Sequence, residues 1–421
     1  MDRFRIIKPI IYAYILFIGF TSAFALTPII SIPFILANLL FVTNVIYSLS
    51  KSKIYPKYNI VDIFIIGFLC ILIFSFFINY LILPSSKSIN HLFAYLFTLL
   101  MYYLNIKYLF KLTSIKIDKV FKMIYYSVLL VSILGIVEFV LKNVFIITDF
   151  ETYIPRPVAN DYDPTVLAEY IRSRSVVEES GHLALFIEIL SPFAWYYLYK
   201  VPNQISTVVK HFSFLSILIC FLLAFSSIGF VILFFVLISL FIRSSFNILK
   251  SGIIKKQSLI LLLLAIIGVY FTLKYSNALE ILEDVVVSKL GSKSGTDRSS
   301  RILEGLETAY NGNFISYLFG YGPGAYEKLN IESIVGLFQN LILELGILGT
   351  FFFGLVYLSS LWELRHITDN TLKIVFHISI GCSFFHYFVI SNYWYPWLWL
   401  VFALIPISKI NHHSENIAPN K

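Results

Sequence analysis

The run of residues 172–182, Arg-Ser-Arg-Ser-Val-Val-Glu-Glu-Ser-Gly-His, is the stretch of this chain most able to do chemistry. It holds two arginines, two carboxylates and a histidine in a chain of which only 13% of residues are charged. If the run is helical, Arg174, Glu178 and His182 stand four residues apart on one stripe. A cation pair beside a carboxylate and an imidazole can hold a phosphate and move a proton. The plainer interpretation, a solvated approach to a helix with local pairing of Arg174 and Glu178, stays open.

A second group of candidates lies in the run 291–301, Gly-Ser-Lys-Ser-Gly-Thr-Asp-Arg-Ser-Ser-Arg, and in Phe-Gly-Tyr-Gly-Pro-Gly at 319–324. Arginines can pair with phosphate oxygens through two parallel hydrogen bonds, and glycines let backbone approach a ligand closely. A flexible turn that returns the chain to the membrane is the plainer interpretation. The sequence contains no GxxxxGK motif, so nothing indicates a nucleoside triphosphate. The candidates here are Arg298, Arg301, Gly320 and Gly322.

The composition indicates the class of protein that carries these residues. The 421 residues are 58% hydrophobic and have a mean hydropathy of +0.81. Apolar runs of about 20 residues recur, each long enough to cross ~30 Å of hydrocarbon as a helix. We therefore predict a single all-α, polytopic integral membrane domain over 1–421, with about twelve transmembrane helices. The expected spans are about 7–26, 28–49, 60–83, 91–110, 121–141, 181–199, two within 212–242, 258–274, 333–361, 372–390 and 394–409. We expect the stretch 212–242 to break near 226–229, and the long span 333–361 to be tilted or kinked near Gly346 or Gly349.

The distribution of lysine and arginine predicts the orientation. Almost all of them in short loops fall on one side, which the positive-inside rule makes cytoplasmic, together with both termini. The two long polar stretches, 142–180 and 275–332, then form two loops that share the outer face. The net charge of +8 belongs to these short loops and indicates no nucleic-acid partner. The three cysteines lie within apolar runs, and no histidine–aspartate cluster has metal-ligand spacing, so we expect no metal and no cofactor.

Among the carboxylates inside expected spans, Glu138, Glu188 and Glu344 are notable. A charge at mid-membrane costs roughly 2.5–3.5 kcal/mol on insertion scales, so such groups usually face the interior of the bundle. Glu138 is near a span end, where we expect an interfacial position. For each of the three, a satisfied hydrogen bond between helices is the plainer interpretation.

These motifs resemble those of the O-antigen polymerase and ligase superfamily of bacterial membrane glycosyltransferases. The family's first-loop pattern reads roughly Arg-x-x-Gly-x-Phe-x-Glu-Pro, often with a histidine two places on. The matching residues are Arg172, Glu179 and His182, whereas Ser175, Val177 and Ser180 depart from the pattern. Later patterns are a Ser-rich run ending in Arg, then Phe-Gly-x-Gly, then Leu-x-Glu-x-Gly-x-x-Gly. The matches are Ser299, Ser300, Arg301, Phe319, Gly320, Gly322, Glu344, Gly346 and Gly349, with Ile342 replacing the leading Leu.

The resemblance implies a GT-C-like architecture and an activity that needs no metal. The protein would polymerise oligosaccharide repeat units carried on undecaprenyl pyrophosphate, for O-antigen or capsule, at the outer face of the cytoplasmic (inner) membrane. Arg172 and Arg301, supported by Arg174 and Arg298, would neutralise the pyrophosphate, and Glu179 or His182 would be the base. Gly320, Gly322 and Glu344 would contribute to substrate binding. Its partners would be the lipid-linked donor and acceptor, the bilayer, and a regulator of chain length.

Two other functions stay open. An O-antigen ligase would transfer the same donor to lipid A-core, but ligases usually carry a His-Asn pair where this chain has Val335 and Gly336. A lipid-oligosaccharide flippase or other transporter would also have many spans. Transporters usually place their polar groups near the membrane midplane and have short outer loops, which the two long polar stretches argue against.

Overall fold

The computed structural model describes residues 7–27, 30–50, 58–82, 84–147, 153–156, 166–167, 170–233, 235–236, 239 and 293–415. The expected span 258–274 and the first part of the stretch 275–332 lie outside the described residues.

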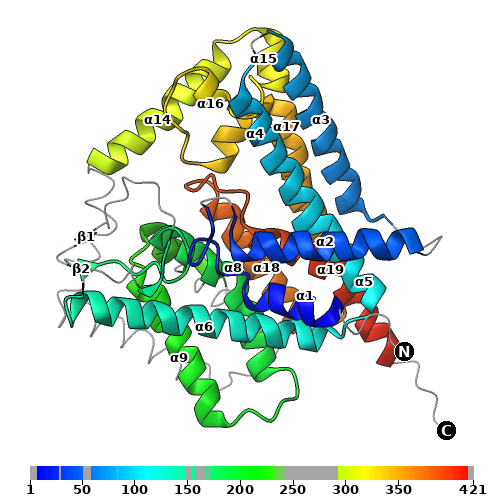
Figure 1. The fold of residues 1–421 in the computed structure, drawn as a ribbon, viewed down its shortest axis with the longest axis vertical. Coiled ribbons are helices and arrows are strands. Elements are labelled where there is room, and N and C mark those ends of the chain that lie inside the picture. Colours follow the sequence, from blue (N-terminus) through cyan, green and yellow to red (C-terminus); the bar gives the residue numbers. More distant parts are fainter. Residues whose placement is uncertain are drawn as a thin grey trace, which may run out of the picture.

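The described chain is predominantly helical, which confirms the all-α class (Figure 1). Its only strands are β1 and β2, which form a two-residue antiparallel pair. The elements are α1 (Ile7–Leu16), α2 (Ile32–Ser50), α3 (Ile60–Ile82), α4 (Ser86–Phe97), a π-helix (Thr98–Asn105), α5 (Ile106–Thr113), α6 (Ile117–Asn143), β1 (Val166–Leu167), β2 (Tyr170–Ile171), α8 (Ser180–Tyr199), α9 (Thr207–Leu223), α14 (Lys293–Tyr310), α15 (Phe314–Phe319), α16 (Ala325–Lys328), α17 (Leu337–Glu363), a 3-10 turn (Leu364–His366), α18 (Asn370–His386) and α19 (Pro396–Glu415).

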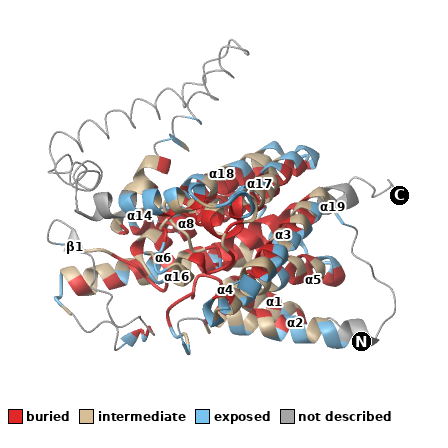
Figure 2. Ribbon diagram, turned by 90° about the horizontal axis from the view of Figure 1, so that it is seen from above, coloured by how far each residue is buried: buried red, intermediate tan, exposed pale blue. Residues whose placement is uncertain are grey.

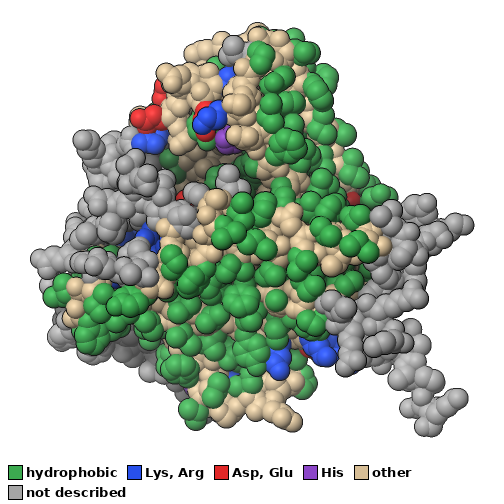
Figure 3. Space-filling model, in the orientation of Figure 1, with side chains coloured by type: hydrophobic (Ala, Val, Ile, Leu, Met, Phe, Trp, Pro, Cys, Tyr) green, Lys and Arg blue, Asp and Glu red, His purple; other side chains and the backbone are tan. Residues whose placement is uncertain are grey.

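Four helical segments in the described part are long and apolar enough to cross a membrane, Ile60–Ile82, Ser86–Thr113, Ile117–Asn143 and Leu337–His366. Figure 3 shows a face dominated by hydrophobic side chains, as a lipid-facing surface would be. The sequence prediction of a helical membrane protein is therefore supported, whereas the count of about twelve spans goes beyond what these four segments show.

Two of the predicted helix interruptions are confirmed. α9 ends at Leu223 and helix resumes at Ser227, close to the expected break within 212–242. α17 is kinked at Gly346, whose φ is 65° and ψ is −167°. Glycine has no Cβ, so it adopts this positive φ at little cost.

The first expected span, 7–26, is wrong in length because α1 ends at Leu16. After it, the backbone N–H groups of Ser22 and Ala23 donate to the carbonyl of Val176 at 3.2 and 3.0 Å. The N–H of Phe24 donates to the carbonyl of Pro155 at 2.8 Å. Pairing with the first polar stretch therefore replaces the last turns of the predicted helix.

The helices pack as a bundle in which α8 lies between α6 and α18, while α17 packs along α3. Figure 2 shows the buried residues concentrated in the middle of this bundle, around α8. At one end, which we call the loop end, the turn 387–395 contacts the loop 170–179 through Tyr395 and Glu178. The same turn contacts the end of the segment 311–337, because the N–H of Leu337 donates to the carbonyls of Tyr387 and Ile390. Both long polar stretches contribute to the loop end, as the predicted topology requires; its outward orientation stays a prediction.

Candidate active site at the loop end

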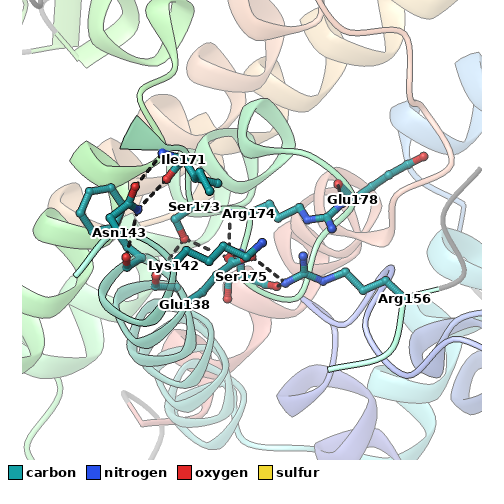
Figure 4. Close-up of polar contacts among 11 residues, drawn as sticks. Glu138, Lys142, Asn143, Arg156, Ile171, Ser173, Arg174, Ser175 and Glu178 are labelled. Atoms are coloured by element: carbon teal, nitrogen blue, oxygen red, sulfur yellow. Dashed lines mark hydrogen bonds and ion pairs between the residues drawn. The ribbon is translucent and has the colours of Figure 1, made fainter. Parts of the chain in front are cut away.

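A fully buried carboxylate, Glu138 of α6, organises the first candidate run (Figure 4). Its Oε2 accepts hydrogen bonds from the backbone N–H groups of Arg174 and Ser175, at 2.9 and 2.5 Å. The Ser173 hydroxyl donates to the same oxygen at 3.3 Å. Glu138 is near the end of its helix as predicted, but it is buried in protein rather than interfacial.

Two buried cations balance this carboxylate. Lys142 Nζ lies 3.2 Å and Arg156 Nη2 lies 3.1 Å from Glu138 Oε1. Arg156 also donates to the carbonyl of Ser175, so the same guanidinium holds both the carboxylate and the loop. A buried charge is tolerated when it is paired and its lone pairs are satisfied, and this one accepts five hydrogen bonds.

The helical stripe predicted over 174–182 is wrong. Residues 172–179 are not helical, and α8 begins only at Ser180 with Glu179 in an extended N-cap conformation. The physical reason is Glu138, since it takes the N–H groups of Arg174 and Ser175 and leaves Ser175 at a φ of 53°. Arg174 Nη1 does donate to Glu178, at 3.4 Å, but to its main-chain carbonyl. Arg174 is only 6% exposed, so the plainer interpretation of a solvated approach does not hold for this residue.

Tyr395, which precedes α19, brings Glu178 and His182 together. Its hydroxyl donates to Glu178 Oε2 at 2.6 Å and lies 3.3 Å from His182 Nδ1. The phenol ring stacks on Trp397, with ring centroids 4.5 Å apart. His182 is buried, Glu179 is half-buried and Glu178 is exposed. A carboxylate, a phenol and an imidazole thus meet at the edge of the bundle, although not through helical spacing.

Arg172 is half-buried where the first loop meets the end of α9. Its Nε donates to the carbonyl of Ala224 at 3.1 Å, and the next residue, Ser173, donates its N–H to Leu223 at 3.1 Å. Two hydrogen bonds to consecutive residues at the α9 terminus fix the direction in which the Arg172 side chain leaves the backbone.

Glu344 organises the second loop motif as Glu138 organises the first. The Tyr95 hydroxyl donates to Glu344 Oε2 at 2.7 Å, and the Gly324 N–H donates to Oε1 at 2.9 Å. The main-chain carbonyl of Glu344 accepts the Gly322 N–H at 2.9 Å. This buried residue therefore satisfies the hydrogen-bonding interpretation of an intramembrane carboxylate, here between a helix and a loop.

The glycines of this motif permit contact between two stretches of backbone. A Cβ on Gly320 would lie 2.3 Å from the carbonyl oxygen of Glu344, and one on Gly346 would lie 2.4 Å from that of Leu318. The loop and the α17 kink thus fit against each other only without side chains. These glycines therefore allow one stretch of protein backbone to approach another closely. A contact of Gly320 or Gly322 with substrate stays a prediction.

Arg301 lies on α14, in the second polar stretch. Its Nε is 2.6 Å from Glu332 Oε2, and the Arg301 side chain is 31% exposed. Arg298 is three residues earlier on the same helix, with its side chain outside the described residues. The structure therefore gathers Arg174, Glu178 and His182 in one place, and Gly320, Gly322 and Glu344 in another.

The third intramembrane carboxylate, Glu188 of α8, pairs with another helix as expected. Its Oε2 lies 2.6 Å from Nδ1 of His386 on α18, and both side chains are buried. This buried polar pair joins α8 to α18.

The turn between α18 and α19 connects the two loop motifs, and sequence reasoning missed it. Tyr393 stacks on Tyr95 with centroids 3.7 Å apart and an interplanar angle of 4°. Tyr95 holds Glu344, while Tyr395, two residues along, holds Glu178. The signal was the aromatic run Tyr-Trp-Tyr-Pro-Trp at 393–397, which is ordinarily taken as an interfacial aromatic belt.

A further charged group lies beside the second motif. Glu327 of α16 is 3.1 Å from Lys87 and 3.7 Å from His91. Burial alone would raise the pKa of Glu327, but the hydrogen bond and charge of Lys87 outweigh it and hold that pKa below its ordinary value. Glu327 is therefore ionised at neutral pH.

Comparison with known proteins adds no assignment, since neither a scan of family models nor a search of curated proteins finds a match. Within the described part of the chain, no group of three or more His, Cys, Asp or Glu side chains is placed to hold a metal ion.

The arrangement has the components of a proton transfer beside an anion. His182 and Glu179 are possible proton acceptors at the start of α8, and two arginines precede them in the same loop. Arginine stays charged at any relevant pH and binds phosphate oxygens in a fixed fork geometry.

Proposed function

We propose that this protein is a membrane glycosyltransferase that polymerises oligosaccharide repeat units linked to undecaprenyl pyrophosphate. The observation that supports it best is the group formed by Glu178, Tyr395 and His182, which Arg174 contacts through the carbonyl of Glu178 at the loop end. The order of the motifs along the chain and their resemblance to the polymerase and ligase superfamily add to this.

In the proposed reaction, a sugar hydroxyl of one lipid-linked unit attacks the anomeric carbon of the glycan on another. The new glycosidic bond forms as the bond between the anomeric carbon and the pyrophosphate oxygen breaks. Undecaprenyl pyrophosphate leaves with the electron pair, and Glu179 or His182 takes the hydroxyl proton. Arg172 and Arg301 would stabilise the negative charge that develops on the leaving group.

The proposal places the protein in the cytoplasmic membrane with about twelve spans, both termini in the cytoplasm and the loop end outside. The four long apolar segments support a membrane location. Contact of both polar stretches with the loop end supports one shared face for the two loops. An outward loop end is where a lipid-linked glycan that has already been flipped would be found.

Deletion of the gene separates this function from its two rivals. Loss of a polymerase leaves flipping and ligation intact, so cells should carry single repeat units on the final acceptor and lose the long ladder. Loss of a ligase would strand long glycan on the lipid carrier, and loss of a flippase would trap single units in the cytoplasmic leaflet. Polysaccharide gels with analysis of the carrier lipid distinguish the three. Long carrier-bound chains in the deletion strain would overturn the proposal in favour of a ligase.

A reconstituted assay tests the chemistry directly. Purified protein should elongate lipid-linked repeat units in the presence of EDTA, because the proposal assigns charge neutralisation to arginine side chains. A strict requirement for a divalent cation would show that this assignment is wrong.

A further inference from the structure

The hydrogen-bond pattern around Tyr395 distinguishes between the two candidate bases. A phenol has one hydrogen to donate and two lone pairs to accept with. The 2.6 Å contact with Glu178 Oε2 takes the hydrogen, because a phenol beside a carboxylate donates and the bond is charge-assisted. The phenol oxygen can then only accept from its other neighbours, which are Asn392 Nδ2 at 3.4 Å and His182 Nδ1 at 3.3 Å.

This pattern fixes the histidine tautomer. If the phenol oxygen accepts from His182, then Nδ1 carries the ring hydrogen. In a neutral imidazole with its hydrogen on Nδ1, the free lone pair is on Nε2. The hydrogen-bond partner of Nδ1 therefore makes Nε2 the nitrogen that can accept a proton. Glu179 shows no comparable hydrogen bond that would orient its carboxylate: it is the N-cap residue of α8, and its side chain makes no capping hydrogen bond.

We propose that His182 is the general base, acting through Nε2, and that Tyr395 is a positioning residue that orients it. This inference rests on the proposed glycosyl transfer. As the acceptor oxygen bonds to the anomeric carbon and the pyrophosphate leaves, the hydroxyl proton passes to Nε2. The resulting imidazolium keeps its Nδ1–H directed at the phenol, whose own hydrogen stays directed at the Glu178 carboxylate. The hydrogen-bonded chain from Glu178 through Tyr395 to His182 thus fixes the orientation of the imidazole ring. The phenol keeps its proton throughout the reaction.

Several features hold Tyr395 in place for this role. Its ring stacks on Trp397, whose Nε1 donates to the carbonyl of Ile18 at 2.9 Å. Tyr393, on the same turn, stacks on Tyr95. Besides the phenol, Glu179, Glu178 and His386 act on His182 through their charges, and Asn392 acts on it through a side-chain hydrogen bond. The turn is thus fixed at both ends, and the phenol hydroxyl has a defined position.

The test uses full-length purified protein and lipid-linked repeat units extracted from the deletion strain. Tyr395→Phe keeps the stacked ring and removes only the hydroxyl. We expect kcat to fall by about tenfold or more with KM changed less than about twofold, and His182→Gln to lower kcat by about a hundredfold. Glu178→Gln weakens the hydrogen bond that the Tyr395 hydroxyl donates, so it should also lower kcat, as Tyr395→Phe does. Glu179→Gln should lower kcat much less than His182→Gln does, because the inference assigns the proton to Nε2 of His182.

A double variant separates positioning from general structural support. If Tyr395 acts through His182, Tyr395→Phe should cause no further loss of kcat in the His182→Gln background. A structural role would lower kcat by the same factor in both backgrounds. Tyr387→Phe is the matched control, since it removes a buried phenol hydroxyl that has no hydrogen-bond partner among the described residues. It should stay within about twofold of the wild type in kcat.

The outcomes separate this inference from the function on which it rests. A wild-type protein that elongates nothing would overturn the proposed function. Elongation by wild type with full activity in Tyr395→Phe, an equal loss in both backgrounds, or loss of activity in Glu179→Gln rather than His182→Gln would overturn the inference alone. If Tyr395→Phe does not fold, Glu178→Gln in the two backgrounds gives the same comparison.

Discussion

Replacing Glu138 by Gln should be among the most damaging conservative substitutions in this protein. The change keeps the size of the side chain and removes one charge. In the native structure, three donors from the first loop reach Oε2, while Lys142 and Arg156 reach Oε1. Gln offers one oxygen and one NH₂ group, so it cannot accept on both sides.

The size of the stability loss depends on whether the donors at Oε1 or those at Oε2 lose their acceptor. The better orientation keeps the amide oxygen on the backbone N–H groups of Arg174 and Ser175 and directs the NH₂ at Lys142 and Arg156. Two charge-assisted hydrogen bonds are then lost, and Lys142 and Arg156 lose the negative charge of Glu138. Removing one partner of a buried ion pair costs about 3–5 kcal/mol. We expect a loss of that size, with a loosened first loop and little transferase activity.

Unfolding of the purified protein in mixed detergent micelles, followed by circular dichroism, measures the change in stability. Glu307→Gln is the matched control, because Glu307 is an exposed residue of α14 and its change should stay within about 0.5 kcal/mol. A Glu138→Gln protein within about 1 kcal/mol of the wild type would refute the reasoning, since a fully buried anion with five donors cannot be that cheaply neutralised.

Other predictions concern the charge, the loop packing and the topology. Arg172→Ala should lower polymerisation by about tenfold or more at normal protein level, with Lys rescuing only partly because it keeps the charge but loses the fork; full activity of the Ala variant would exclude Arg172 from the site. Gly320→Ala should destabilise the protein by about 1–3 kcal/mol, because φ is 73° and a Cβ would meet backbone, whereas Gly354→Ala meets nothing within 4 Å and should be neutral or stabilising in thermal unfolding. Single cysteines at Asp161 and Ser294 should react with an impermeant thiol reagent in outer-permeable cells, and protection of either would contradict the outward loop end.

The sequence determined the features that depend on local composition. Apolar runs specify membrane helices because the hydrocarbon leaves backbone polar groups no partner outside the helix itself. Glycines at 346 and 349 marked where α17 could kink, because glycine adopts a positive φ at little cost, and the structure places the kink at Gly346. The carboxylates at 138, 188 and 344 were recognisable as special, because an intramembrane charge needs a partner, although sequence named none of the partners.

Only the tertiary structure decided how the candidate residues are arranged. Helical spacing placed Arg174, Glu178 and His182 on one stripe, but Glu138, which lies 36 residues before Arg174, takes the N–H groups that such a helix needs. Glu178 and His182 still converge, because Tyr395 bonds Glu178 across 217 residues. Sequence periodicity reports only the local conformational preference of a segment. A hydrogen bond between distant segments depends on how the whole bundle packs, and it can override local preference at the few positions where a site is built.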